Sequence, residues 1–258
     1  QTYKTDDFMV FFKPGYERRA LTLLSELEYF KYIPQKITGN IIKNVPVLLE
    51  DFGQYPPFGG YTSPVYDKME VVNREYDEGY SFALVGIHEY THYLHLLMKD
   101  DFPGILSFLF GDIFCPNIFS PLWFLEGITT YTESKLDRFT GRLNSGFFDA
   151  YMGASVYEKK LPSILKATYS PLEPPGGFGY YLYGGEFFKY LAQKYGEEKF
   201  KEFFKSYSGS VFSYLSPLFP WLGMDRTFNE VYKKGTLELW DEWLVNEKAK
   251  YKSFRIWW

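Results

Sequence analysis

The stretch His88-Glu89-Tyr90-Thr91-His92 contains two histidines four positions apart, which on a helix lie on one side, about 40° apart around its axis. Both imidazoles can therefore reach one metal ion. Glu89 lies off that side, where its carboxylate can contact a water at the metal without binding the metal. The pattern indicates a hydrolytic zinc site. The alternative is a pair of hydrogen-bonded core histidines with a glutamate at this spacing by chance.

The residues around this stretch predict a buried helix over residues 80–98. Apolar side chains occur on most of its sides, and it contains no proline and one glycine, Gly86. Ser81 is a suitable N-cap, and Lys99 and Pro103 lie beyond the other end. Histidines on such a helix need partners, because a buried polar group without a hydrogen bond is costly.

Length and composition limit the classes of protein that this chain can belong to. With 258 residues it can bury a large core, as one domain or two closely packed lobes. Aromatic residues make up 22%, which indicates a thick aromatic core or a cleft for extended polymers. The net charge of -4 provides no basic field, so we expect no nucleic-acid partner. A single cysteine, Cys115, excludes an internal disulfide.

The two longest apolar runs, residues 105–110 and 211–224, are too short or too interrupted by proline to span a bilayer. We therefore expect no membrane contact beyond a peripheral one. The chain begins at Gln1 without a methionine and ends abruptly with Trp257 and Trp258. We expect a processed or excised chain with a C-terminal continuation or a docking tail.

The chain order predicts an α+β fold. Residues 1–99 form an α/β lobe with a small mixed sheet, a helix over residues 16–32 that ends at Ile33-Pro34, and the active-site helix. Residues 100–258 form a mainly helical lobe, in which Asp225 is an expected N-cap. Both lobes make one catalytic domain, with the metal between them. The expected strands cover residues 8–12, 45–49, 61–66 and 69–73, and the later helices cover residues 122–136, 147–160, 183–195, 197–207, 225–234 and 237–250.

A catalytic zinc needs a third protein ligand. Glu126 is the best candidate, because it lies at the centre of an apolar helical segment where an unpartnered carboxylate would be costly. His95 lies on the side of His88 and His92 but a turn further on, so we expect it behind the ligands or in the core. Glu133, two turns after Glu126, either supports a ligand, lines the cleft or ends the helix in solvent.

These residues carry a family resemblance. His88 to His92, followed by Trp123-Phe-Leu-Glu-Gly127 and Glu133, resembles the gluzincin zinc metallopeptidases. The segments Tyr180-Tyr-Leu-Tyr-Gly-Gly185 and Tyr195-Gly-Glu-Glu-Lys199 extend the likeness to the bacterial and archaeal peptidase MA-like domains, over about residues 8–207. The resemblance implies a zincin-like fold, one Zn²⁺ per chain held by His88, His92 and Glu126, and Glu89 as the general base.

The aminopeptidase-type gluzincins also supply a tyrosine to the oxyanion from a Tyr-x-x-Gly motif. Tyr181 matches that tyrosine and is expected to precede a helix; Tyr183 is the alternative, and both could instead be packing residues. The amine-binding Gly-x-Met-Glu-Asn strand of those enzymes is absent. Gly60 and Tyr61 lie where a substrate-pairing edge strand is expected. An endopeptidase acting on peptides or unfolded protein is therefore expected rather than an aminopeptidase.

The segment of residues 100–120 is longer than in the aminopeptidases, and its apolar run over residues 105–110 is expected to wall the cleft, with membrane or partner contact as the alternatives. Many members of the family continue into a β-propeller, which would explain the abrupt end of the chain. The missing methionine and the resemblance imply an extracytoplasmic location. Two alternatives to a peptidase are a non-catalytic binding module for a peptide or partner, and a zinc hydrolase acting on a non-peptide bond. The intact Glu89 and ligand set favour the enzyme.

Overall fold

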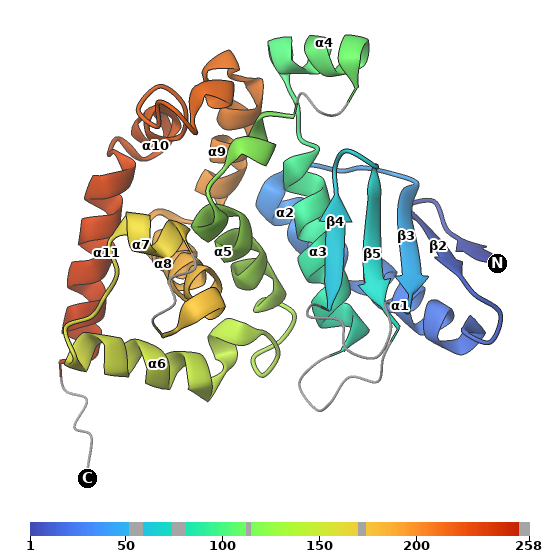
Figure 1. Ribbon diagram of the computed structural model, residues 1–258, viewed down its shortest axis with the longest axis horizontal. Coiled ribbons are helices and arrows are strands. Elements are labelled where there is room, and N and C mark those ends of the chain that lie inside the picture. Colours follow the sequence, from blue (N-terminus) through green and yellow to red (C-terminus); the bar gives the residue numbers. More distant parts are fainter. Residues whose placement is uncertain (52–58, 74–80, 112–114, 170–173, 253–258) are drawn as a thin grey trace.

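The computed structural model describes residues 1–51, 59–73, 81–111, 115–169 and 174–252. A lobe with a small sheet comes first in the chain and a helical lobe follows, so the α+β class is confirmed (Figure 1). The buried apolar residues form two cores, one mainly in each lobe, and Ile33 and Ile37 of the first lobe pack in the core of the second. The residues of the site come from helices of both lobes.

The sheet has five strands in the order β1-β2-β3-β5-β4. The three central strands are parallel, and both outer strands are antiparallel to their neighbours. Alternate residues of β2, β3 and β5 are fully buried, as the period of two in a strand requires. The bounds are β1 (Thr2–Lys4), β2 (Phe8–Phe12), β3 (Val45–Glu50), β4 (Gly60–Ser63) and β5 (Lys68–Val72). β4 is thus an edge strand of this sheet.

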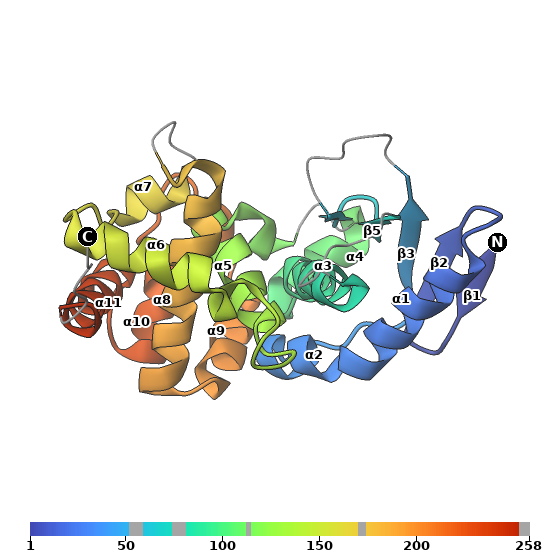
Figure 2. The same cartoon turned by 90° about the horizontal axis from the view of Figure 1, so that it is seen from below.

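Three helices belong to this lobe: α1 (Glu17–Phe30), α2 (Tyr32–Thr38) and α3 (Phe82–Leu96). α3 packs against α1, β4 and β5 (Figure 2). Ser81 caps α3 as predicted, since its hydroxyl accepts a hydrogen bond from the backbone N–H of Leu84. The helix predicted over residues 16–32 is α1, which ends at Phe30, but Ile33-Pro34 is not a break, because a second, unpredicted helix α2 contains both residues. Pro34 lies in the first turn of α2, where its missing N–H breaks no helical hydrogen bond.

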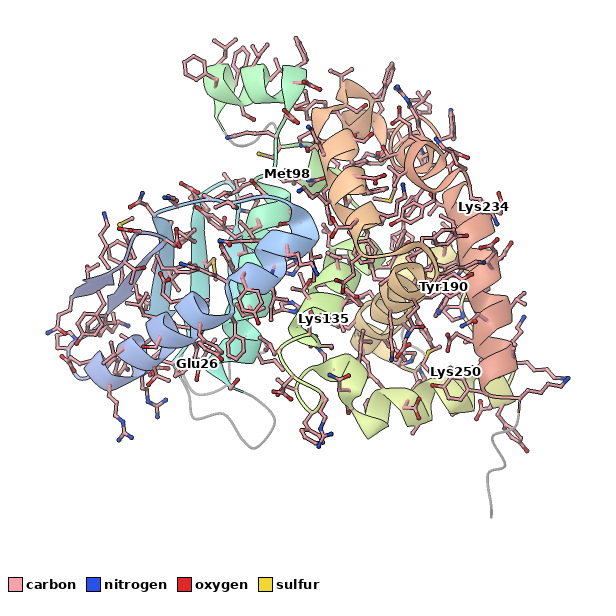
Figure 3. All side chains as sticks on the ribbon, turned by 180° about the vertical axis from the view of Figure 1, so that it is seen from behind. Glu26, Met98, Lys135, Tyr190, Lys234 and Lys250 are labelled. Carbon is pink, nitrogen blue, oxygen red and sulfur yellow. The ribbon has the colours of Figure 1, made fainter. Side chains whose placement is uncertain are left out.

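The helical lobe is built around aromatic side chains, which fill the space between its helices (Figure 3). Trp123, Phe187 and Trp240 pack edge to face or tilted at its centre. This confirms a thick aromatic core. The helices are α4 (Asp101–Phe110), η2 (Pro116–Phe119), α5 (Leu122–Glu133), η3 (Arg142–Asn144), α6 (Gly146–Tyr157), α7 (Ile164–Thr168), η4 (Gly176–Phe178), α8 (Gly179–Tyr195), α9 (Glu198–Gly209), η5 (Val211–Leu215), α10 (Met224–Tyr232) and α11 (Thr236–Lys250).

Two predicted helix starts are corrected. Asp225 does not cap α10, whose N-cap is Gly223. The Asp225 carboxylate instead accepts a hydrogen bond from the backbone N–H of Thr236, at the start of α11, over 2.6 Å. α8 begins at Gly179, so Tyr181 and Tyr183 lie inside this helix and not before it.

Two glycines let α5 and α8 cross closely. A Cβ atom on Gly184 would lie 2.1 Å from the carbonyl oxygen of Trp123, and one on Gly127 would lie 2.6 Å from the carbonyl carbon of Gly184. Neither position can hold a larger residue without moving a helix backbone. Glycine disfavours a helix on its own, by about 1 kcal/mol relative to alanine. Here it brings the start of α8 next to the helix that carries Glu126.

Candidate metal centre

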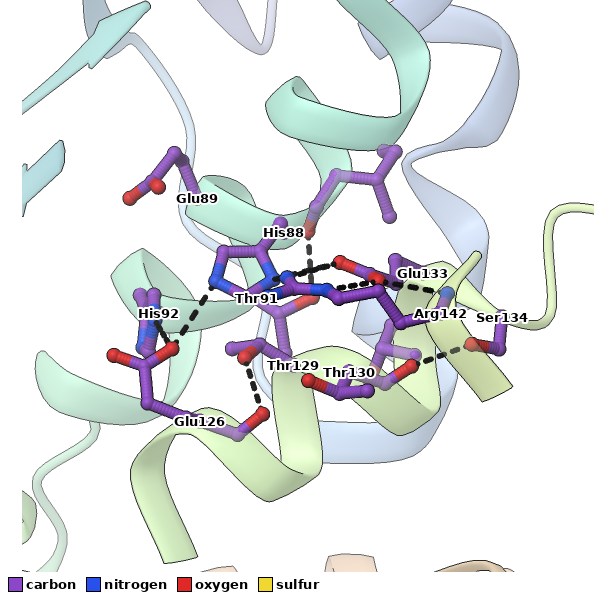
Figure 4. Close-up of polar contacts among 12 residues, drawn as sticks. His88, Glu89, Thr91, His92, Glu126, Thr129, Thr130, Glu133, Ser134 and Arg142 are labelled. Atoms are coloured by element: carbon purple, nitrogen blue, oxygen red, sulfur yellow. Dashed lines mark hydrogen bonds and ion pairs between the residues drawn. The ribbon is translucent and has the colours of Figure 1, made fainter. Parts of the chain in front are cut away.

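His88, His92 and Glu126 meet between α3 and α5 (Figure 4). The Nε2 atoms of His88 and His92 lie 3.3 Å and 3.2 Å from Glu126 Oε2. The three ligand atoms all lie within 4.8 Å of one another, and the two histidines are buried. The structure thus brings together the three residues that the sequence predicted as metal ligands.

The spacing of these atoms fits zinc. Ligand atoms about 2.0–2.1 Å from a tetrahedral zinc are themselves about 3.3 Å apart. The two nitrogen-to-oxygen distances, 3.3 Å and 3.2 Å, match that separation. Two imidazoles and one carboxylate are also a donor set that catalytic zinc uses. The three residues can hold a metal ion, and zinc is one metal that their donor atoms and spacing fit.

Burial and the neighbouring histidines have opposite effects on the pKa of Glu126. Burial alone would raise the pKa of its carboxyl, but the neighbouring His92 and His88 hold that pKa well below its usual range. The carboxylate therefore stays ionised, which is the form that binds a metal.

A second carboxylate lies behind His88. Glu133 Oε2 is 2.8 Å from His88 Nδ1, and Glu133 is fully buried at the end of α5. The interpretation of Glu133 as a solvated helix end is therefore wrong. A carboxylate that accepts from Nδ1 keeps the proton there and leaves Nε2 free for a metal.

His92 is backed by another histidine. His95 Nε2 lies 3.2 Å from His92 Nδ1, while the ring of His95 packs beside Phe204 with 5.7 Å between centroids. His95 is fully buried, and burial holds its pKa well below the usual range, so it is neutral. It lies behind His92 in the core, as expected, and is not in the group that could hold a metal.

Glu89 lies on the sheet side of α3. Its Oε2 accepts a hydrogen bond of 2.9 Å from the Thr62 hydroxyl on β4. Burial raises the pKa of Glu89 above its ordinary value, although the neighbouring His88 and His92 act in the opposite direction. A Cβ atom on Gly60 would come within 2.6 Å of Glu89 Cγ, so glycine is needed there. A buried carboxyl with a raised pKa, next to a group of potential ligands, suits a proton acceptor.

The two candidate tyrosines point to different surroundings. The Tyr181 ring lies 6.1 Å from the His88 ring, centroid to centroid. Burial and the charge of Glu126 raise the Tyr181 pKa, so its hydroxyl keeps its proton. Tyr183 is buried in the helical core, and its hydroxyl bonds to Ser155 over 3.2 Å. Tyr181 is thus the one of the two that lies beside the group that could hold a metal.

Two further expectations concern the surroundings. Gly60 and Tyr61 lie on the edge strand β4, and Tyr61 is 54% exposed. The expectation that residues 105–110 wall the cleft is wrong. They belong to α4, which packs on α9 and stands away from α3 and α5 (Figure 1), and Phe108 is 89% exposed. Five of its apolar side chains are exposed, namely Phe102, Ile105, Phe108, Leu109 and Phe110.

Sequence reasoning missed Arg142. Its guanidinium bonds to both carboxylate oxygens of Glu133 and lies 2.8 Å from His88 Nδ1. It also lies over the ring of Tyr181, 4.2 Å from the centroid. No motif marks it, since it follows Glu133 by nine residues outside any helical period. The one available signal is that a buried Glu133 would need a cation.

No family model matches this chain, and a search of curated proteins finds no match either. The gluzincin resemblance therefore rests on the residues quoted above, and the zincin-like fold remains a prediction. None of the described helices combines the length and apolar character needed to cross a membrane.

Proposed function

We propose that this protein is a zinc-dependent peptidase, more an endopeptidase than an aminopeptidase, with one zinc held by His88, His92 and Glu126. The observation that carries the proposal is the convergence of these three side chains from two helices with spacings that suit a tetrahedral metal. The buried Glu89 beside them adds a proton acceptor.

Zinc, when bound, supplies a Lewis acid that lowers the pKa of water. Glu89 accepts a proton from the attacking water and later passes it to the leaving amine. Its raised pKa favours both steps, because the carboxyl can hold the proton between them. The Tyr181 hydroxyl keeps its proton and can donate a hydrogen bond to the carbonyl oxygen as negative charge develops there.

The edge strand supports a peptide substrate. β4 pairs with β5 on one side, and its opposite edge is unpaired among the described residues. An extended peptide can add to such an edge through backbone hydrogen bonds. β4 also carries Thr62, which binds Glu89, so a peptide paired with β4 would run close to the proton acceptor. Strand addition needs no free amine, which favours internal bonds of a peptide or unfolded protein.

The test compares wild type with Glu89→Gln for zinc content and for cleavage of unfolded casein and mixed peptides. We expect about one zinc per chain in both proteins, and cleavage that is about 100- to 10,000-fold slower in the variant. Glu158→Gln is the control, because Glu158 lies on the surface and pairs with Lys160. The positions of the cuts decide between endopeptidase and aminopeptidase.

Two outcomes would contradict the proposal. Cleavage that is equal in wild type and Glu89→Gln would remove Glu89 from the mechanism. Zinc binding without cleavage of any substrate would favour the non-catalytic binding module instead.

A further inference from the structure

Arg142 is bound to Glu133 by three hydrogen bonds. Its Nε and Nη2 atoms donate to the two carboxylate oxygens over 2.7 Å each, and its backbone N–H donates to Oε1 over 3.1 Å. The Arg142 side chain is 18% exposed and Glu133 is fully buried. Paired bonds between a guanidinium and a carboxylate fix the plane of both groups. Arg142 and Glu133 therefore behave as one rigid unit.

The backbone around Arg142 is also fixed. Gly141 has φ +93°, and a Cβ atom there would lie 2.4 Å from the Cα of Ser134, so this turn requires glycine. The Ser134 hydroxyl accepts a hydrogen bond from the backbone N–H of Leu143. The Asn144 side-chain amide donates to three carbonyl oxygens of the same turn, those of Ser134, Asp137 and Thr140. The position of Arg142 is thus set by its backbone as well as by its side chain.

The Tyr181 ring rests against this unit. The guanidinium carbon of Arg142 lies 4.2 Å from the ring centroid, within the range of a cation–π interaction. The His88 and Tyr180 rings are the other aromatic neighbours, at 6.1 Å and 4.7 Å. The Tyr181 hydroxyl makes no hydrogen bond to another described residue. Nothing else among these contacts fixes the ring through a charge or a hydrogen bond.

We propose that Arg142 is a positioning residue that holds the Tyr181 ring beside the metal ligands while Glu133 anchors it. The Arg142 guanidinium thus connects Glu133, the hydrogen-bond partner of His88, to the ring of Tyr181. The inference rests on the proposed function, because it deepens the role of Tyr181. It assigns Arg142 no contact with the substrate.

Arg142→Lys is the central variant, because lysine keeps the charge but loses the paired bonds and the planar face. Arg138→Lys is the matched control, since Arg138 lies in the same turn over Phe139 and has no described contact with the site. The steady-state constants of both variants, of Tyr181→Phe and of the Arg142→Lys/Tyr181→Phe double variant are measured at saturating zinc. A crystal structure of Arg142→Lys gives the position of the Tyr181 ring.

We expect Arg142→Lys to lower kcat about tenfold or more and to leave KM within about threefold, as for a group that acts only in the transition state. In the Tyr181→Phe background the same change should have no further effect, because both substitutions remove one interaction. The crystal structure should show the ring displaced. The Arg138→Lys control should match wild type.

The inference is overturned if Arg142→Lys keeps the wild-type kcat, if its loss multiplies with that of Tyr181→Phe, or if the ring stays in place. Each of these results leaves the peptidase proposal standing as long as wild type cleaves and Glu89→Gln does not. If wild-type protein loaded with zinc cleaves nothing, the proposed function fails, and the ring position alone decides the role of Arg142.

Discussion

Glu133 and His88 lie 2.8 Å apart, oxygen to Nδ1, on the side of the imidazole that faces away from Glu126. One ring is therefore held between two carboxylates, one from the middle of α5 and one from its end. The Glu133 carboxyl has a pKa lowered to about 2, because the charge and hydrogen bonds of Arg142 outweigh the effect of burial. Glu133 is therefore ionised at neutral pH, and its oxygen can accept a hydrogen bond from His88 Nδ1.

Glu133→Gln should weaken zinc binding about 10- to 100-fold, because the amide is a poorer acceptor for Nδ1–H and leaves Arg142 without its counter-charge. The dissociation constant is measured by competition with a chelator. Glu158→Gln serves again as the surface control. An unchanged dissociation constant for Glu133→Gln would show that Glu133 does not support the ligand.

His95→Phe should weaken zinc binding by a similar factor, about 10- to 100-fold, because it removes the hydrogen-bond partner of His92 Nδ1 while keeping a ring beside Phe204. The melting temperature of the metal-free protein is measured in parallel. If the melting temperature falls and the zinc constant does not change, His95 only packs the core.

Gly60→Ala should reduce cleavage about 10- to 100-fold and leave zinc binding within about twofold. The new methyl group would come closest to Glu89 Cγ, and then to the Glu70 carbonyl oxygen and Val85, none of which is a proposed ligand. Gly59→Ala is the matched control, since the three atoms nearest to a Cβ atom there all belong to Val85. Equal activity in the two variants would mean that Glu89 adapts to the methyl group, or that its position does not matter.

Glu242→Gln should remove part of the acid sensitivity of folding. A hydrogen bond from Lys234, with others from Lys194 and Tyr195, outweighs burial and lowers the Glu242 pKa to about 2. The unfolded value is about 4.3. The stabilisation is therefore present above about pH 4.3 and is lost as the pH falls towards 2.

Urea midpoints for wild type and Glu242→Gln are compared at pH 7 and pH 3. We expect a clear difference at pH 7 that shrinks at pH 3, with the variant the less stable protein at pH 7. A difference that is the same at both pH values would mean that the Glu242 charge does not contribute.

Sequence patterns predicted the features that depend on residues close together in the chain, such as helix periodicity and helix caps. The spacing of the two histidines and the Ser81 cap predicted α3 and its start. The apolar setting of Glu126 predicted its place in the group that could hold a metal. Other features depend on contacts distant in sequence. Arg142 reaches the site through a turn fixed by Gly141 and Asn144, and Asp225 caps a helix eleven residues away. The direction of the α4 side chains could not be predicted from hydrophobicity, because in this helix the polar Ser107 is buried while Phe108 is exposed.

The close crossing at Gly127 and Gly184 ties α5 to α8, so Glu126 and Tyr181 belong to one body, whereas His88 and His92 belong to α3 and pack with the sheet. The group that could hold a metal is thus divided between two helices, α3 and α5, whose buried side chains belong mainly to different cores. If α3 and α5 separate by a fraction of an ångström, the distances from the two histidines to Glu126 increase. We expect this to happen before either core unfolds. The dissociation constant for the metal should therefore depend on how closely the two lobes pack. Substitutions at their interface, distant from the site, should change it even where the melting temperature is unchanged.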